Sequence, residues 1–243
     1  MKLLALDSSG LVASVAVMED DTMVAEYTMN YKKTHSQTLV PMLDQMSKMI
    51  ELDLNTIDAI AIASGPGSFT GLRIGSATAK GLGLALNKPI IPVPTVDALA
   101  YNLCGNTGVI CPIMDARRNQ VYTGIYQFVS DGCEGFVMET LQTQTAVLIQ
   151  DIVSQLNELG QPVIFIGDGV PVFKEQLKEL MKVPYSFAPA HLSRQRAAAV
   201  GALGMIYYKE GKFESAALHE PEYLRMSQAE RERAENAKLQ GDA

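Results

Sequence analysis

The N-terminal segment alternates between short apolar stretches and polar turns. Lys2–Leu6 is an apolar run that ends in the turn sequence Asp7-Ser8-Ser9-Gly10, and Leu11–Met18 then alternates small and apolar residues. Asp20 and Asp21 mark the next turn, before a third segment at Thr22–Met29. Short strands joined by tight turns are typical of an antiparallel meander, so we predict antiparallel strands here.

Apolar residues then change to helical spacing. After Thr34 or Ser36, either of which can cap a helix, they recur at every third or fourth position. A continuous apolar run farther along favours a buried central strand. The predicted elements are a helix from His35 to Ile50, a strand Ile57–Ala63, a helix Thr70–Leu86, a strand Pro89–Val93 and a helix Thr95–Leu103.

The second half of the chain repeats this order of elements. A tail from Met226 onward is rich in Ala, Glu, Arg, Gln and Lys without a stable apolar stripe, so we expect a frayed helix or disorder there. The predicted elements are strands Val109–Met114, Gln120–Phe128, Phe136–Thr140 and Val163–Ile166, and helices Thr145–Leu156, Val172–Met181 and Ser193–Tyr208.

The two halves resemble each other in sequence. Leu3–Asp7 corresponds to Cys111–Asp115, and Ile62–Gly67 corresponds to Ile164–Gly169. Chance similarity between ordinary apolar strands is the alternative explanation. A duplication predicts an α/β protein with a first lobe at 1–104, a second lobe at 105–225 and a polar C-terminal tail at 226–243.

Composition narrows the class of protein. The chain has 243 residues, of which 47% are hydrophobic and 19% charged, an ordinary globular balance. Its net charge of −7 argues against stand-alone nucleic-acid binding, which needs clustered cations, but not against assisting a basic partner. Cys104, Cys111 and Cys133 form no CxxC pair, and no apolar stretch reaches membrane-spanning length. We therefore expect a cytoplasmic protein without a membrane segment.

Two aspartates end the first strand of each half. An aspartate at such a position is explained by turn chemistry alone, because its carboxylate accepts backbone N–H groups. The functional alternative is that the two hairpins face each other and hold phosphates or a metal ion. The first hairpin carries small residues and the second carries arginines. The candidate nucleotide or phosphate residues are Asp7, Ser8, Ser9, Asp115, Arg117 and Arg118.

The densest motif runs from Gly65 to Gly75. It leads into a helix N-terminus, where free N–H groups favour an anion, but it matches neither a Walker A loop nor GxGxxG. Small residues continue along this helix to Ala85 and keep it slim. Because glycine costs about 1 kcal/mol relative to alanine inside a helix, close packing of another element is the favoured explanation.

The helix at 35–50 carries a methionine-rich stripe. Such a stripe is usually core, but this one covers more than a narrow face, and methionine suits surfaces that adapt to a partner. Together with the slim helix it predicts a two-helix docking face, which Met42→Asp or Gly75→Asp should disrupt without unfolding the protein. The predicted docking residues are His35, Leu39, Met42, Met46, Met49, Gly71, Arg73, Gly75 and Thr78.

Catalytic groups are sparse. His35, His191 and His219 are far apart in the sequence and show no metal-site spacing. The chain has no GxSxG elbow, and no Ser–His–acid arrangement can be named. We therefore predict neither catalytic residues nor a metal site.

Several of these segments resemble the bacterial TsaB family of tRNA threonylcarbamoyladenosine biosynthesis proteins. The resemblance covers about residues 1–225 and is most specific at Gly65–Arg73 and Asp115–Arg118. It implies the actin and sugar-kinase (ASKHA) type of fold, with two tandem ribonuclease H-like lobes, in agreement with the duplication. The matching segments are Leu4–Ser9, Thr34–Gln37, Ser64–Arg73, Asp115–Arg118 and Tyr223–Arg225.

The resemblance also implies a function. Members act as the non-catalytic partner of the paralogue TsaD, which binds metal and transfers the carbamoyl group, and the ATPase TsaE joins the pair. The catalytic paralogue has two histidines four residues apart on its first-lobe helix, whereas here His35 is followed four residues later by Leu39. We expect a heterodimer with TsaD, a homodimer when the chain is alone, and contact with tRNA only through the complex.

Two alternatives remain from the sequence. The chain could be a nucleotide-hydrolysing or phosphotransfer enzyme that holds ATP or ADP with Mg²⁺ between the lobes, using Asp7 and Asp115. A protease is the other, without a histidine pair or nucleophile triad to support it. The TsaB-like interpretation itself requires no cofactor.

Overall fold

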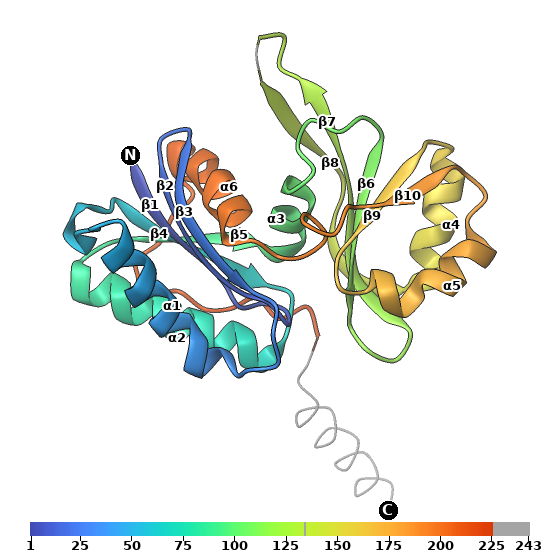
Figure 1. The fold of residues 1–243 in the computed structure, drawn as a ribbon. Helices are drawn as coiled ribbons and strands as arrows, with labels where there is room; N and C mark the ends of the chain where they lie inside the picture. The colour runs from blue at the N-terminus through green and yellow to red at the C-terminus, as the bar shows by residue number, and fades with distance from the viewer. Residues whose placement is uncertain (134, 226–243) are drawn as a thin grey trace, which may run out of the picture.

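The computed structural model describes residues 1–133 and 135–225, which form two lobes side by side (Figure 1). A five-stranded sheet with the order β3-β2-β1-β4-β5 forms the centre of the first lobe. Its strands are β1 (Lys2–Asp7), β2 (Ala13–Glu19), β3 (Thr22–Met29), β4 (Ala59–Gly65) and β5 (Ile90–Pro94), and its helical segments are α1 (His35–Met49), the 3₁₀ turn η1 (Leu54–Thr56), α2 (Phe69–Leu86) and α3 (Thr95–Tyr101).

The second lobe is built on another five-stranded sheet, with the order β10-β9-β6-β7-β8. Its strands are β6 (Val109–Asp115), β7 (Gln120–Ser130), β8 (Phe136–Leu148), β9 (Val163–Ile166) and β10 (Tyr185–Phe187), and the helices of this half are α4 (Ile149–Leu159), α5 (Val170–Leu180) and α6 (Ala197–Lys209).

The duplication predicted from the sequence is confirmed by the topology. In both sheets the first strand of the half pairs antiparallel with the second and parallel with the fourth. Asp7 and Asp115 end the equivalent strands β1 and β6. The predicted fold class, α/β with two ribonuclease H-like lobes of the actin and sugar-kinase type, is therefore correct.

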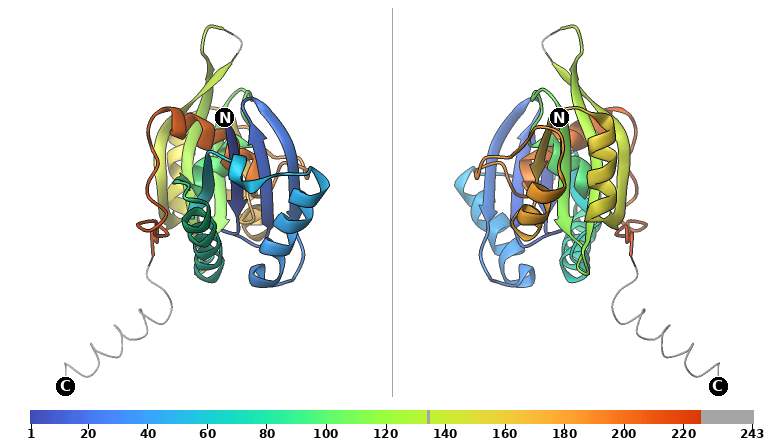
Figure 2. Two further views of the ribbon diagram at one scale, coloured as in Figure 1. Left: turned by 90° about the vertical axis from the view of Figure 1, so that its left-hand side faces the viewer. Right: turned by 90° about the vertical axis from the view of Figure 1, so that its right-hand side faces the viewer.

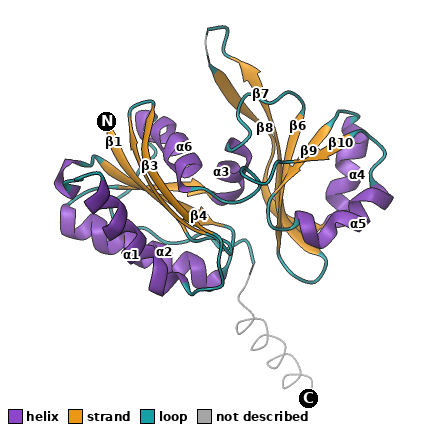
Figure 3. Ribbon diagram, in the orientation of Figure 1, coloured by secondary structure: helices purple, strands orange, loops and turns teal. Residues whose placement is uncertain are grey.

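Each sheet is covered on both faces (Figures 2 and 3). Helices α1 and α2 pack on the outer face of the first sheet, and α4 and α5 pack on the outer face of the second. Between the two sheets lie α3 and α6, which contact each other. Because both faces of the central strands are covered, β1 and β4 are apolar along almost their whole length.

The third helix of the second half returns to the first lobe. Helix α6 packs on β1, β2, β4 and β5, and its buried side chains share a core with residues of those strands. Residues 210–225 continue along the same lobe, where Glu214 pairs with Ile90 of β5. The expected second lobe at 105–225 therefore needs correction, because α6 and the segment around Glu214 pack on the first lobe, while Glu222 and Arg225 also contact the second. The predicted tail at 226–243 lies outside the described residues.

Three predicted boundaries are wrong: the end of β8, the start of α4, and the start of α6, which is Ala197 rather than Ser193. Strand β8 extends to Leu148, so α4 begins at Ile149 rather than at Thr145. Pairing with β7 as far as Gln120 keeps Thr145–Leu148 extended. The short edge strand β10 had no periodic signal in the sequence. Among the described residues, no helix combines the length and apolar character that crossing a bilayer requires.

The slim face of α2 is explained by close packing inside the first lobe. A Cβ at Gly71 would overlap the carbonyl oxygen of Ser8, and one at Gly75 would overlap the Ser8 hydroxyl. A Cβ at Gly83 would lie 2.7 Å from the Cβ of Ala216, whereas one at Gly81 would enter open space. Close packing therefore explains Gly71, Gly75 and Gly83, whereas Ala77, Gly81 and Ala85 are exposed.

Candidate functional site

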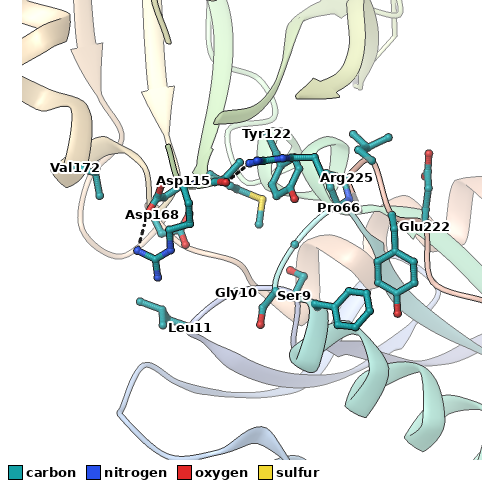
Figure 4. Close-up of a pocket in the computed structure, with 18 residues that line it drawn as sticks. Ser9, Gly10, Leu11, Pro66, Asp115, Tyr122, Asp168, Val172, Glu222 and Arg225 are labelled. Atoms are coloured by element: carbon teal, nitrogen blue, oxygen red, sulfur yellow. Dashed lines mark hydrogen bonds and ion pairs between the residues drawn. The ribbon is translucent and has the colours of Figure 1, made fainter. Parts of the chain in front are cut away.

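A pocket of about 440 Å³ lies between the two lobes (Figure 4). The hairpin after β1 and the first turn of α2 form one wall, and the turn after β6 forms another. The C-terminal segment His219–Arg225, which we call the strap, lines the rest. The lining residues are Ser9, Gly10, Leu11, Pro66–Phe69, Met114–Arg117, Tyr122, Asp168, Val172 and Glu222–Arg225.

The first hairpin directs its aspartate inward. Asp7 is 1% exposed, and its Oδ1 accepts hydrogen bonds from the backbone N–H of Ser9 at 2.9 Å and from the Ser9 hydroxyl at 2.6 Å. Burial raises the pKa of Asp7 to about 6, against the lowering effect of both Ser9 hydrogen bonds. Its carboxylate therefore stabilises the turn and does not line the pocket.

The second hairpin closes in the same way but with different side chains. Asp115 accepts the backbone N–H of Arg117 at 2.8 Å, and its other oxygen lies 3.1 Å from the Arg117 guanidinium. Three successive residues, Arg117 to Asn119, have positive φ angles. The interpretation of both aspartates as turn-forming residues is therefore confirmed.

The predicted phosphate residues are only partly brought together. Ser9, Asp115 and Arg117 line the pocket, whereas Asp7, Ser8 and Arg118 do not. Two of the hairpin N–H groups, those of Ser9 and Arg117, already donate to their own aspartates and are therefore not available to a phosphate. This arrangement does not fit a Mg²⁺–nucleotide cradle on the two hairpins.

An acidic residue that the sequence analysis did not select also faces the pocket. Asp168, which follows β9, has an Oδ1 without a hydrogen-bond partner among the described residues. Burial is the main reason that its pKa is raised. Asp168 lies in the loop Gly167–Gly169, which corresponds in the duplication to the turn Gly65–Gly67. This correspondence is the sequence signal from which Asp168 could have been predicted as a pocket residue.

The strap was also missed as a pocket wall. The Tyr223 ring packs on Phe69, and Glu222 donates its N–H to the Ser64 carbonyl at 2.7 Å. Arg225 donates to the carbonyl of Ala116 in the second lobe. The strap therefore links the first turn of α2 to the opposite hairpin, although the Tyr223–Arg225 segment was noted only for its family resemblance.

Most of the predicted docking residues are not available at the surface. Leu39, Met42 and Met46 are at most 5% exposed and belong to the core between α1 and the first sheet. Gly71 and Gly75 are also buried, against the first hairpin. The expectation that Met42→Asp or Gly75→Asp would leave the fold intact is therefore wrong, because neither site can accept a charged side chain without disturbing its neighbours.

The outer faces of α1 and α2 nevertheless carry exposed side chains. Met49 is 75% exposed, and Val40 and Leu84 are more than half exposed. Arg73 is exposed, and Thr78 is half-buried with its hydroxyl bonded to the Ile74 carbonyl. The two helices lie next to each other, so the accessible part of the predicted docking face consists of these exposed side chains and not of the buried Leu39, Met42 and Met46.

His35 and Leu39, the residue four positions later, lie in different environments. The Nε2 of His35 lies 2.8 Å from the Gly10 carbonyl oxygen, while Leu39 is buried in the core. Within residues 1–133 and 135–225, no group of three His, Cys, Asp or Glu side chains could ligate a metal ion. The described region thus holds no geometry that pairs His35 with other ligands.

Comparisons with known proteins agree with this architecture. A family model described as TsaD, tRNA N6-adenosine threonylcarbamoyltransferase, matches residues 22–233. The chain is 33% identical to a Bacillus subtilis protein named tRNA threonylcarbamoyladenosine biosynthesis protein TsaB, over 98% of this chain and 100% of that protein. It is 29% identical to the Escherichia coli protein of the same name, over 74% of this chain and 76% of that one.

Similarity to a solved structure covers nearly the whole fold. A crystal structure from Pseudomonas aeruginosa, titled as an uncharacterized protein with similarity to peptidase YEAZ, superposes with a TM-score of 0.78 at 26% identity. The superposition covers 92% of this chain and 99% of that one.

Proposed function

Because the chain belongs to the TsaB family of tRNA threonylcarbamoyladenosine biosynthesis proteins, we propose that it is the non-catalytic subunit that binds and activates the transferase TsaD. Formation of the modified adenosine beside the anticodon then takes place on TsaD. TsaE joins this pair, the proteins meet in the cytoplasm, and tRNA is contacted through the complex. The net charge of −7 supports an indirect role in tRNA binding.

The main support for a non-catalytic role is that this chain lacks the second histidine of the pair that the resemblance assigns to TsaD. The resemblance gives TsaD two histidines four residues apart on the helix that corresponds to α1. Here the second position is Leu39, whose side chain has no lone pair for a metal ion and is buried in the core. The first, His35, contacts the Gly10 carbonyl through Nε2. Both features support a subunit that has lost this metal site.

The exposed faces of α1 and α2 support the docking role. Met49, Val40 and Leu84 present large apolar side chains to solvent on two adjacent helices of one lobe. Exposed large apolar side chains are candidates for an interface, and because Val40 and Met49 are nine residues apart they lie on different sides of α1. In the absence of TsaD, we expect the same surface to pair two copies of the chain.

The alternative function, nucleotide hydrolysis or phosphotransfer, finds less support in the pocket. Of its two proposed carboxylates, Asp7 is bonded to Ser9 and does not line the cavity, whereas Asp115 lines the cavity but is paired with Arg117. Measurable ATP turnover by the purified chain, lost in Asp115→Asn, would favour this alternative over the scaffold role.

Reconstitution is the decisive experiment. TsaD, TsaE and the enzyme that supplies the carbamoyl-adenylate are incubated with tRNA, with and without this chain. We expect modification to depend on the chain and to saturate at a one-to-one ratio with TsaD. Equal modification in its absence would contradict the proposal.

A further inference from the structure

A second cavity, of about 370 Å³, lies outside the inter-lobe pocket, on the exposed side of α2. One wall is the helix itself and the other is the strap. Its residues are Arg73, Ser76, Ala77, Lys80, His219, Glu220, Pro221 and Tyr223. Because α2 belongs to the proposed docking face, this groove is open to the same partner.

Two cationic side chains, Arg73 and Lys80, lie on the wall of the groove that α2 forms. Arg73 and Lys80 are seven residues apart on α2, which places them about 10 Å apart along the helix axis and on the same side. Between them the floor is formed by the small side chains of Ser76 and Ala77. The small side chains therefore leave room for a ligand between the two positive charges.

Both cations keep unused hydrogen-bond donors. Arg73 donates through Nε to the Tyr223 hydroxyl at 3.3 Å, and its guanidinium carbon lies 4.0 Å from the centre of the Phe69 ring. Lys80 donates to the His219 carbonyl at 2.8 Å. A guanidinium has five N–H donors and an ammonium three, so most of the donors remain available for a ligand.

Neither cation forms an ion pair within the part of the chain that the structure describes. Among residues 1–133 and 135–225, no carboxylate lies within ion-pairing distance of Arg73 or Lys80. Glu220 also lines the groove, where it is exposed and forms no ion pair with Arg73 or Lys80. Among the described residues the two cations make hydrogen bonds but no ion pair, so with Glu220 the groove carries a formal excess of one positive charge.

The opposite wall is held rigidly. His219 is fully buried, and its Nδ1 lies 2.7 Å from a carboxylate oxygen of Glu214. Its Nε2 has no hydrogen-bond partner among the described residues. The carbonyl that binds Lys80 therefore has a fixed position, which reduces the entropy that Lys80 would lose on binding a ligand.

The geometry points to this groove as a receptor for an acidic side chain, Asp or Glu, of the partner protein that docks on α1 and α2. The inference rests on the proposed function and adds the chemistry of the contact. A carboxylate entering over Ser76 and Ala77 accepts from Arg73 on one side and from Lys80 on the other. Such charge complementarity fixes the register of docking, while the apolar side chains contribute most of the affinity.

Binding of the chain to TsaD from the same organism tests the inference, measured by titration calorimetry from about 50 to about 300 mM NaCl. We expect Arg73→Gln with Lys80→Gln to weaken binding about tenfold at low salt and to make the dependence of Kd on salt shallower. Lys182→Gln, which removes an exposed cation from the second lobe, is the matched control and should bind like the wild type.

The variant Tyr223→Phe distinguishes the effect of the Arg73 charge from the effect of holding the strap in place. It removes the acceptor of the Arg73 hydrogen bond but retains the ring on Phe69 and the Arg73 charge. Wild-type affinity for this variant supports the inference. If Tyr223→Phe weakens binding as much as Arg73→Gln, the contact acts by holding the strap and the inference is overturned.

The remaining outcomes are also decisive. Unchanged TsaD affinity in the double variant overturns the inference and leaves the proposed function standing. A double variant that binds TsaD normally but loses affinity for tRNA, or for a second copy of the chain, assigns the groove to that other partner. A wild-type chain that does not bind TsaD at all overturns the proposed function and the inference together.

Discussion

The ring of Tyr223 packs on the ring of Phe69 with centroids 4.7 Å apart and planes inclined by 38°. These residues are far apart in sequence, and their contact places the strap over the first turn of α2. The strap then crosses to the second lobe, where Gln144 donates to Glu222 at 2.9 Å and Arg225 donates to Ala116. One short segment thus lines both cavities and connects both lobes.

Loss of this contact should loosen the strap. Tyr223→Ala removes the aromatic pair and the acceptor for Arg73, so we expect unfolding to cost about 1 to 2 kcal/mol less than in the wild type. Amide exchange in residues 219–225 should become faster. Tyr31→Ala, at a tyrosine 68% exposed, is the control, and an equal effect of both variants would contradict a specific role for the Tyr223 contact.

The small residues of α2 should respond unequally to added methyl groups. Gly75→Ala forces a Cβ against the Ser8 hydroxyl, so we expect it to destabilise the protein by about 1 to 2 kcal/mol. Gly81→Ala enters open space and should stabilise the helix by up to about 1 kcal/mol. Urea unfolding measures both. Similar midpoints for the two variants would show that close packing on Ser8 is not what keeps the helix slim.

Substitutions of two methionines of α1 should distinguish an effect on folding stability from an effect on TsaD binding. Met42→Asp places a charge in the first-lobe core and should destabilise the protein by at least about 3 kcal/mol. Met49→Asp changes a side chain 75% exposed, so stability should shift by no more than about 0.5 kcal/mol. If the proposed docking face is correct, Met49→Asp still weakens TsaD binding. Unaltered binding would remove the exposed end of α1 from the interface.

Asp7 should make stability depend on pH in the direction opposite to that of a salt-bridged carboxylate. Its folded pKa of about 6 exceeds the value of about 3.9 for an unfolded aspartate. Between these values the folded state holds a proton that the unfolded state releases, so the Asp7 contribution to stability increases as pH falls from about 6 to about 4.

Comparison with Asp7→Asn isolates this contribution. The stability of the wild type minus that of the variant should rise by about 1.4 kcal/mol for each unit of pH lowered within the window, and should be constant above about pH 7. Urea unfolding at several pH values provides the measurement. A difference independent of pH would mean that Asp7 ionises normally in the folded protein.

The limits of the sequence prediction are clear at particular residues. Periodicity identified the apolar stripe containing Leu39, Met42 and Met46, but it could not say whether a sheet or a partner covers that stripe. The structure shows that the first sheet does. The Thr145–Leu148 segment has residues compatible with both helix and strand, and only pairing with β7 makes it extended.

By itself the sequence determined the duplicated order of strands and helices and the turn chemistry of Asp7 and Asp115, because these depend on side-chain spacing and on hydrogen bonds between neighbours in the chain. The tertiary structure alone decided that α6 returns to the first sheet and that the strap forms a wall of both cavities. Such contacts join residues more than a hundred positions apart, as Arg225 and Ala116 are. They depend on how the lobes are placed in space, which no local pattern of residues encodes.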